Sequence, residues 1–204
     1  MPITEILSQN ANQYRQDISL VEINPETLEK HQIKWSEFEL VEATSGIQFR
    51  REMTWGDFDD QANRFANLLL DRGIKKGDQV AILLMNCLEW LPIYFGILKT
   101  GAIVVPLNFR YTAEEIKYCL ELSETDLLIF GPEFIERLDL IKDDLPQVNA
   151  LFFVGDDCPS FAESYDLLAA DYSSAAPDIS LADEDDAALY FSSGTTGFPK
   201  AILH

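Results

Sequence analysis

The residues with the clearest chemical potential form a run near the end of the chain, residues 192–200, which reads Ser-Ser-Gly-Thr-Thr-Gly-Phe-Pro-Lys. Gly194 and Gly197 can adopt positive φ angles, so backbone amides around them can point at one anion. Lys200 adds a mobile positive charge suited to phosphate. Four hydroxyl side chains add hydrogen-bond donors: Ser192, Ser193, Thr195 and Thr196. This combination predicts a loop that binds the phosphates of a nucleotide.

Composition alone leaves other interpretations of this run open. A cluster of Ser, Gly, Thr and Pro is commonly no more than a turn or loop. A Walker-type hydrolase loop is disfavoured, because that motif places glycine directly before its lysine and a helix after it. Here Pro199 precedes Lys200, and proline lacks the amide that such a helix start would contribute.

The order of the residues is more specific than their composition. The pattern Ser-Gly-Thr-Thr-Gly-x-Pro-Lys at 193–200 resembles, position for position, the signature loop of the adenylate-forming (AMP-binding) superfamily. That superfamily holds acyl-CoA synthetases, aryl-CoA ligases, peptide-synthetase adenylation domains and firefly-type luciferases. Ala201 departs from the pattern, since glycine commonly follows the lysine, and Ser192 stands where threonine is common. If position 201 required a positive φ angle, alanine would cost about 1 kcal/mol there.

Two upstream segments extend the resemblance to about residues 49–204. Residues 53–58 are similar to a Leu-Thr-Tyr-x-Glu-Leu helix start, and residues 98–108 are similar to Leu-Lys-x-Gly-Ala-x-x-x-Pro-Leu-Asn. We interpret both segments as structural. The Pro-Leu-Asn at 106–108, followed by Thr-Ala-Glu-Glu at 112–115, is closer to acyl- and aryl-CoA ligases than to peptide-synthetase domains.

The resemblance implies a ligase that uses ATP, Mg²⁺ and coenzyme A. A small-molecule carboxylate, whether fatty, aromatic or small and branched, would form an acyl-adenylate and pyrophosphate, and a thiol would then displace AMP. The loop would hold the ATP phosphates, with Thr195 and Thr196 orienting them and Lys200 screening their charge. Whether the acceptor is coenzyme A or a carrier-protein thiol stays open, as do the acid and the oligomeric state.

The resemblance also implies that residues 1–204 are the N-terminal portion of the large AMP-binding domain, with 1–53 a variable segment. The family's adenine and ribose contacts and its small C-terminal domain would lie beyond His204. The isolated chain is therefore expected to be inactive. The alternative is a non-catalytic α/β module that binds a nucleotide or a partner protein, and the sequence beyond His204 would discriminate the two.

Composition and charge indicate a globular protein whose partner is neither nucleic acid nor an anionic membrane. The chain has 204 residues, 47% of them hydrophobic and 25% charged, as in an ordinary globular domain. The net charge of -20 argues against nucleic acid or an anionic membrane as partner, because those require a basic surface. The three cysteines lack metal-ligand spacing and fit reduced thiols in the cytoplasm, and His31 and His204 are too few for a zinc site. No secretory signal or transmembrane segment is evident.

Strand and helix patterns alternate along the chain, which predicts an α/β fold of βαβ units with a parallel sheet. Apolar runs predict strands over 18–23, 79–84, 102–106, 126–130, 150–154 and 187–191. Helical spacing predicts helices after Thr54, before Gly101 and after Thr112, and over 132–142 and 161–170, with a further helix start at 24–26. The last strand would deliver the loop at its carboxyl end, where open α/β sheets bind ligands.

Overall fold

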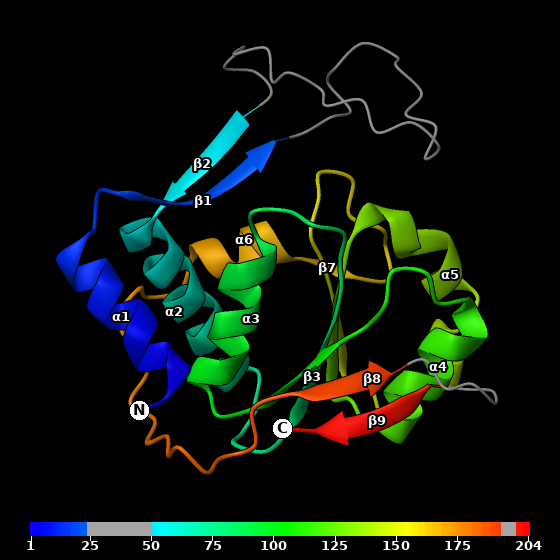
Figure 1. The fold of residues 1–204 in the computed structure, drawn as a ribbon. Coiled ribbons are helices and arrows are strands. Elements are labelled where there is room, and N and C mark those ends of the chain that lie inside the picture. The colour runs from blue at the N-terminus through cyan, green and yellow to red at the C-terminus, as the bar shows by residue number, and fades with distance from the viewer. Residues whose placement is uncertain (24–49, 193–198) are drawn as a thin grey trace, which may run out of the picture.

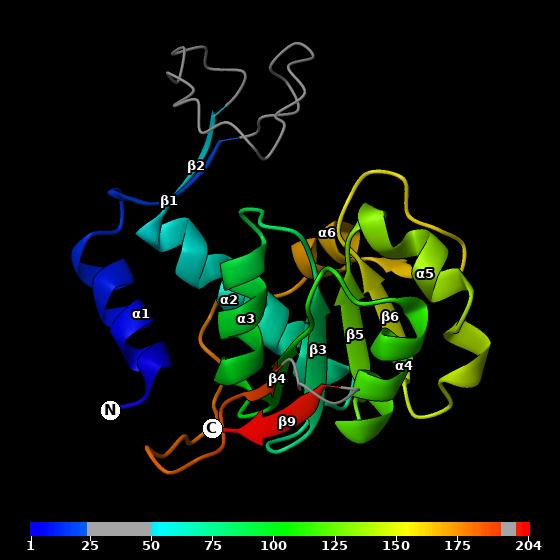
Figure 2. The ribbon, with the colours of Figure 1, turned by 45° about the vertical axis from the view of Figure 1, so that its right-hand side comes forward.

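A parallel sheet of five strands, in the order β4-β3-β5-β6-β7, forms the centre of the protein. We describe a computed structural model for residues 1–23, 50–192 and 199–204. The sheet strands are β3 (Gln79–Leu83), β4 (Ile103–Pro106), β5 (Leu127–Phe130), β6 (Ala150–Phe153) and β7 (Glu163–Ser164). The central strands read as continuous apolar runs because helices cover both faces of the sheet (Figure 2).

The helices divide into two layers. On one face lie α2 (Trp55–Asp71), α3 (Trp90–Lys99) and α6 (Tyr165–Ala170), and on the other lie α4 (Ala113–Leu122) and α5 (Ile135–Asp139) (Figures 1 and 2). One core lies on each face of the sheet, and a smaller cluster around Leu7, Met53 and Phe58 lies between residues 3–13, residues 50–54 and α2. One of the two cores gathers residues such as Phe65 and Ile93 under α2 and α3, and the other gathers residues such as Ile116 and Phe130 under α4 and α5.

The predicted helix starts are confirmed by their caps. Thr54 accepts a hydrogen bond from the amide of Asp57 at 3.1 Å. Thr112 and Glu115 form the predicted capping box, in which each side chain accepts from the other's amide, at 3.3 and 2.8 Å. The apolar face predicted for α2 is buried throughout, and Gly73, just beyond that helix, has a φ angle of +89°. Local sequence therefore defines these two helices well.

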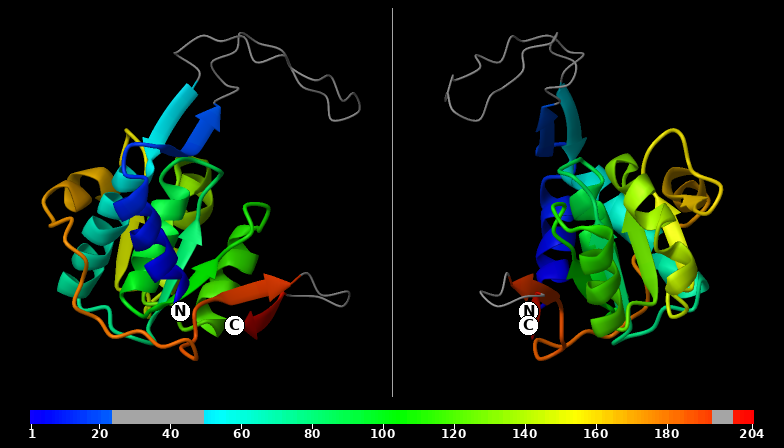
Figure 3. Two further views of the ribbon diagram at one scale, coloured as in Figure 1. Left: turned by 60° about the vertical axis from the view of Figure 1, so that its left-hand side comes forward. Right: turned by 90° about the vertical axis from the view of Figure 1, so that its right-hand side faces the viewer.

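Two antiparallel pairs flank the central sheet. The first is formed by β1 (Ile18–Ile23), a predicted strand, and β2 (Arg50–Thr54) (Figure 1). The second is formed by β8 (Leu189–Ser192) and β9 (Lys200–Leu203), and the two views of Figure 3 show that it extends away from the body. Helix α1 (Ile3–Gln13) was not predicted, although its buried residues Leu7 and Ala11 stand at helical spacing. The helix start expected at 24–26 lies outside the described residues.

Three element predictions need correction. The helix expected over 132–142 is broken into η3 (Pro132–Phe134), α5 and η4 (Lys142–Asp144), because short 3-10 turns redirect the chain toward the same core. The helix expected over 161–170 begins only at Tyr165, where Ser164 caps it after the edge strand β7. The strand expected at 187–191 exists as β8, but β8 pairs with β9 and is not a member of the five-stranded sheet.

Candidate functional site

The β8–β9 pair carries the described ends of the predicted phosphate loop. Five predicted site residues lie outside the described residues: Ser193, Gly194, Thr195, Thr196 and Gly197. The two that are described, Ser192 and Lys200, stand opposite each other in the antiparallel register. Opposed residues place their side chains on the same face of such a pair, and both residues are exposed. The fold therefore brings the first hydroxyl and the lysine of the motif together at one place.

The backbone that follows the lysine is unstrained. Lys200 and Ala201 belong to β9, and among the described residues only Glu124 combines a side chain with a positive φ angle. Alanine in place of the family's usual glycine therefore causes no conformational penalty at position 201. Pro199 comes directly before β9, where its missing amide leaves the pairing of Lys200 with Ser192 intact.

Strand β8 is anchored to the body at its beginning. The amide of Val104 in β4 donates to the carbonyl of Ala187 at 3.0 Å, and Val104 forms an isolated parallel bridge with Ala188. The side chains of Leu189 and Phe191 pack against the core under α4. On the other face, the hydroxyl of Tyr190 lies 2.8 Å from that of Tyr94 in α3. Burial first, and then the Tyr190 hydroxyl, raise the pKa of Tyr94.

A second feature is a cavity of about 640 Å³ at the carboxyl edge of the parallel sheet, beyond the ends of β3, β5 and β6. Its lining is acidic and includes Glu133, Asp156 and Asp166, and burial followed by neighbouring carboxylates raises the pKa of Asp166. Neither Ser192 nor Lys200 lines it. Besides these carboxylates the lining includes the guanidinium of Arg51, but acidic groups predominate, which disfavours an uncompensated phosphate in this cavity.

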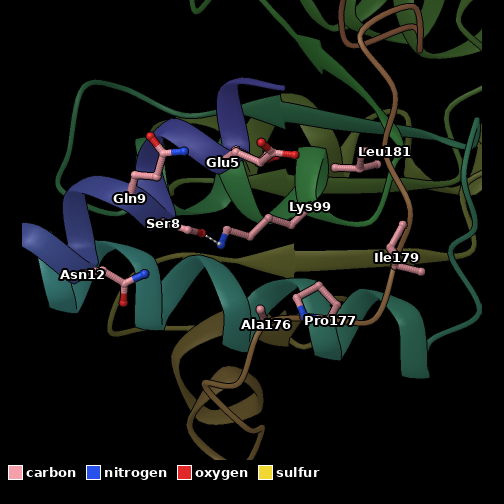
Figure 4. A pocket seen from close by; sticks show the side chains of 10 residues that line it. Glu5, Ser8, Gln9, Asn12, Lys99, Ala176, Pro177, Ile179 and Leu181 are labelled. Carbon is pink, nitrogen blue, oxygen red and sulfur yellow. Dashed lines mark hydrogen bonds between the residues drawn. The ribbon is translucent and has the colours of Figure 1, made fainter. Parts of the chain in front are cut away.

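A third feature is a cavity of about 320 Å³ between α1, α3 and residues 176–181 (Figure 4). The buried ammonium of Lys99 lies at its base, 2.7 Å from Asp59 Oδ1, 2.7 Å from Asn63 Oδ1 and 3.3 Å from Ser8 Oγ. An ammonium has three hydrogens, and these three acceptors use them all. Lys99 therefore joins three helices, in agreement with the structural role expected for residues 98–108.

The three cysteines, Cys87, Cys119 and Cys158, are free thiols. In the ranges 1–23, 50–192 and 199–204, no three His, Cys, Asp or Glu side chains converge as metal ligands. No helix in those same ranges has the length and apolar character needed to cross a bilayer.

A family model supports the resemblance seen in the loop. Residues 34–204 match the model described as AMP-binding enzyme. A medium/long-chain-fatty-acid–CoA/3-oxocholest-4-en-26-oate–CoA ligase of Mycolicibacterium smegmatis is 35% identical over 156 residues, which cover 74% of this chain and 28% of that protein. A crotonobetaine/carnitine–CoA ligase of Citrobacter koseri is 34% identical over 172 residues, covering 80% of this chain and 32% of the relative. The chain thus spans about a third of the length of these relatives or less.

Solved structures agree with the sequence relatives. An anthranilate CoA ligase in complex with anthranoyl-AMP superposes with a TM-score of 0.83 at 25% identity, covering 100% of this chain and 34% of that one. A Mycobacterium tuberculosis fatty acyl CoA synthetase gives a TM-score of 0.76 at 25% identity, covering 99% of this chain and 34% of that one. The α/β architecture is therefore that of the acyl-CoA synthetase fold.

Proposed function

Since the chain belongs to the AMP-binding enzyme family, we propose that it contributes the phosphate-binding part of an ATP-dependent CoA ligase. In this reaction a carboxylate attacks the α-phosphate of ATP, forming an acyl-adenylate and releasing pyrophosphate. The thiol of coenzyme A then attacks the acyl carbon and displaces AMP. Such chemistry depends mainly on positioning and on stabilisation of charge, which a loop of amides, hydroxyls and a lysine supplies.

The observation that carries the proposal is that Ser192 and Lys200 are opposed in the β8–β9 pair. The two described ends of the motif therefore lie side by side. Thr195 and Thr196 would orient the β- and γ-phosphates, and the amides around Gly194 and Gly197 would approach them closely. Lys200 would screen the negative charge as pyrophosphate departs.

The remaining components fit this assignment. Mg²⁺ would neutralise phosphate charge, with oxygen ligands from ATP and from protein carboxylates. The free thiols support a cytoplasmic location. Residues 1–204 would form the N-terminal portion of the AMP-binding domain, with 1–53 as its variable segment.

The test compares the 204-residue chain with the protein encoded by the complete reading frame that contains it. ATP–pyrophosphate exchange is measured with panels of fatty and aromatic carboxylic acids. We expect acid-dependent exchange, and AMP-forming thioester synthesis with coenzyme A, from the complete protein only. The chain alone should bind tripolyphosphate weakly and catalyse no exchange, because it spans 28–32% of its relatives.

Two outcomes would contradict this assignment. Acid-dependent exchange by the 204-residue chain alone would show that the phosphate-binding part is self-sufficient. Absence of exchange from the complete protein with every acid would favour the rival function, a module that binds a nucleotide or partner without catalysis. In that case tripolyphosphate binding by the chain would still separate a nucleotide-binding module from a protein-binding one.

A further inference from the structure

Strand β8 (Leu189–Ser192) forms no ladder with the central sheet. In the described part of the chain, the bridge to β4 is an isolated one between Val104 and Ala188, the residue just before β8 and four residues before Ser192. Further along β4, Pro106 has no amide to donate, so it cannot extend a ladder toward β8. The end of β8 that carries the phosphate motif therefore depends on side chains for its position relative to the body.

Side chains on both faces of β8 contact the rest of the protein. Leu189 and Phe191 pack into the core under α4 through apolar contacts, which are not directional. Tyr190, between them, points to the opposite face and is 41% exposed. Its hydroxyl lies 2.8 Å from the hydroxyl of Tyr94, which is a direct and directional link from β8 to helix α3.

The α3 side of this link is itself fixed. The ring of Tyr94 stacks on Trp90 one helical turn earlier, with ring centroids 5.2 Å apart and 16° between planes. On the β8 side, the ring of Tyr190 makes an edge contact with His204 at 5.6 Å. The main chain of His204 in turn exchanges hydrogen bonds with Ala188. The two hydroxyls thus connect the Trp90–Tyr94 stack on α3 to the group formed by Tyr190, His204 and Ala188.

We propose that the Tyr94–Tyr190 hydroxyl pair positions Ser192 and Lys200, the described ends of the phosphate motif, by holding the β8–β9 pair against α3. The inference rests on the proposed phosphate-binding function. Both tyrosines are positioning residues, since neither carries a charge suited to phosphate. The pair links α3, whose N-terminal end faces the carboxyl edge of the sheet, to the one strand that enters the motif.

The experiment uses the 204-residue chain and inorganic tripolyphosphate as the probe. Tyr94→Phe, Tyr190→Phe and the double variant are compared by isothermal titration calorimetry at fixed ionic strength. Loss of one hydrogen bond predicts binding weakened by about two- to fivefold in each single variant. The double variant should bind no more weakly than either single one, because both changes remove the same contact.

A matched control separates positioning from general stability. Tyr172→Phe removes another exposed hydroxyl contact, 2.7 Å from Asp71, in a part of the protein away from β8. It should lower the urea midpoint by as much as Tyr94→Phe while leaving tripolyphosphate affinity unchanged. Amide hydrogen exchange should accelerate in residues 190–192 and 200–202 for the Tyr94 and Tyr190 variants only.

The outcomes distinguish this inference from the proposed function. If the unmodified chain binds tripolyphosphate and both single variants bind equally well, the positioning role is wrong while phosphate binding stands. If the unmodified chain shows no binding at any concentration tested, phosphate binding by the chain is wrong and the positioning role falls with it. If the loss of tripolyphosphate affinity in the double variant equals the sum of the two single losses, the two hydroxyls act separately. That result would also contradict a positioning role for the hydroxyl pair.

Discussion

Replacing Lys99 by methionine tests whether the buried ion pair beneath α1 stabilises the fold. The Lys99 side chain is 5% exposed and that of its partner Asp59 is 14% exposed, with 2.7 Å between Lys99 Nζ and Asp59 Oδ1. The Lys99 side chain is drawn in Figure 4. Methionine keeps the apolar length of the side chain but removes the charge. The Asp59 carboxylate would remain nearly buried without a cation.

The magnitude depends on the hydrogen bonds that Asp59 retains. Breaking a buried pair by removing one partner costs about 3–5 kcal/mol. Asp59 still accepts hydrogen bonds from Ser8 at 3.1 Å and from Asn63 at 3.1 Å, which places the expected loss at the lower end. A loss of about 3 kcal/mol in the free energy of unfolding corresponds to a melting temperature lower by about 6–12 °C for a chain of this size.

Urea unfolding followed by circular dichroism and by tryptophan fluorescence measures this loss. The matched control is Lys117→Met, which breaks an exposed pair with Asp144 at 3.2 Å and should cost less than about 1 kcal/mol. Adding Asp59→Asn to Lys99→Met removes the uncompensated charge, so the double variant should lose less than the sum of the single losses. The reasoning is refuted if Lys99→Met is no more destabilising than Lys117→Met.

Three further predictions concern catalysis, folding and pH. In the protein encoded by the complete reading frame, Lys200→Ala should slow adenylation more than thioester formation from preformed acyl-adenylate; equal slowing of both half-reactions in single-turnover assays would argue against charge screening. Thr112→Ala should lower the free energy of unfolding by about 1 kcal/mol through loss of its cap, whereas Thr112→Ser should restore most of it in urea titrations. Burial and the Glu89 carboxylate raise the pKa of Cys87 from 9.0 to about 12. Because the folded chain holds this proton more tightly, its contribution to stability is complete below pH 9 and is lost as pH rises toward 12. Iodoacetamide should accordingly modify Cys87 more slowly at pH 8 than it modifies free cysteine, and a matching rate would contradict the burial argument.

Local sequence predicted the elements whose signals are contained within a few residues. The capping box at Thr112, the apolar face of α2 and the apolar runs of β3 to β6 were all visible, because caps and periodicity act over one or two turns. Strand β7 was not predicted, because its two residues at the edge of the sheet are too few to show a periodic pattern. The sequence analysis also joined the 3-10 turns around α5 into one helix, because Phe134, Leu138 and Ile141 all face the core and thus imitate helical spacing.

Residue order alone was enough to identify the family, the α/β alternation and the phosphate-binding groups of residues 192–200, because a motif is a property of consecutive residues and does not depend on what packs around them. The place where that motif is presented depends instead on tertiary structure. Long-range pairing sets Lys200 opposite Ser192 and takes β8 out of the parallel sheet. It also brings Tyr94 to Tyr190 across 96 positions of sequence. Contacts of such separation depend on how helices and strands pack together, and no local pattern in the chain records them.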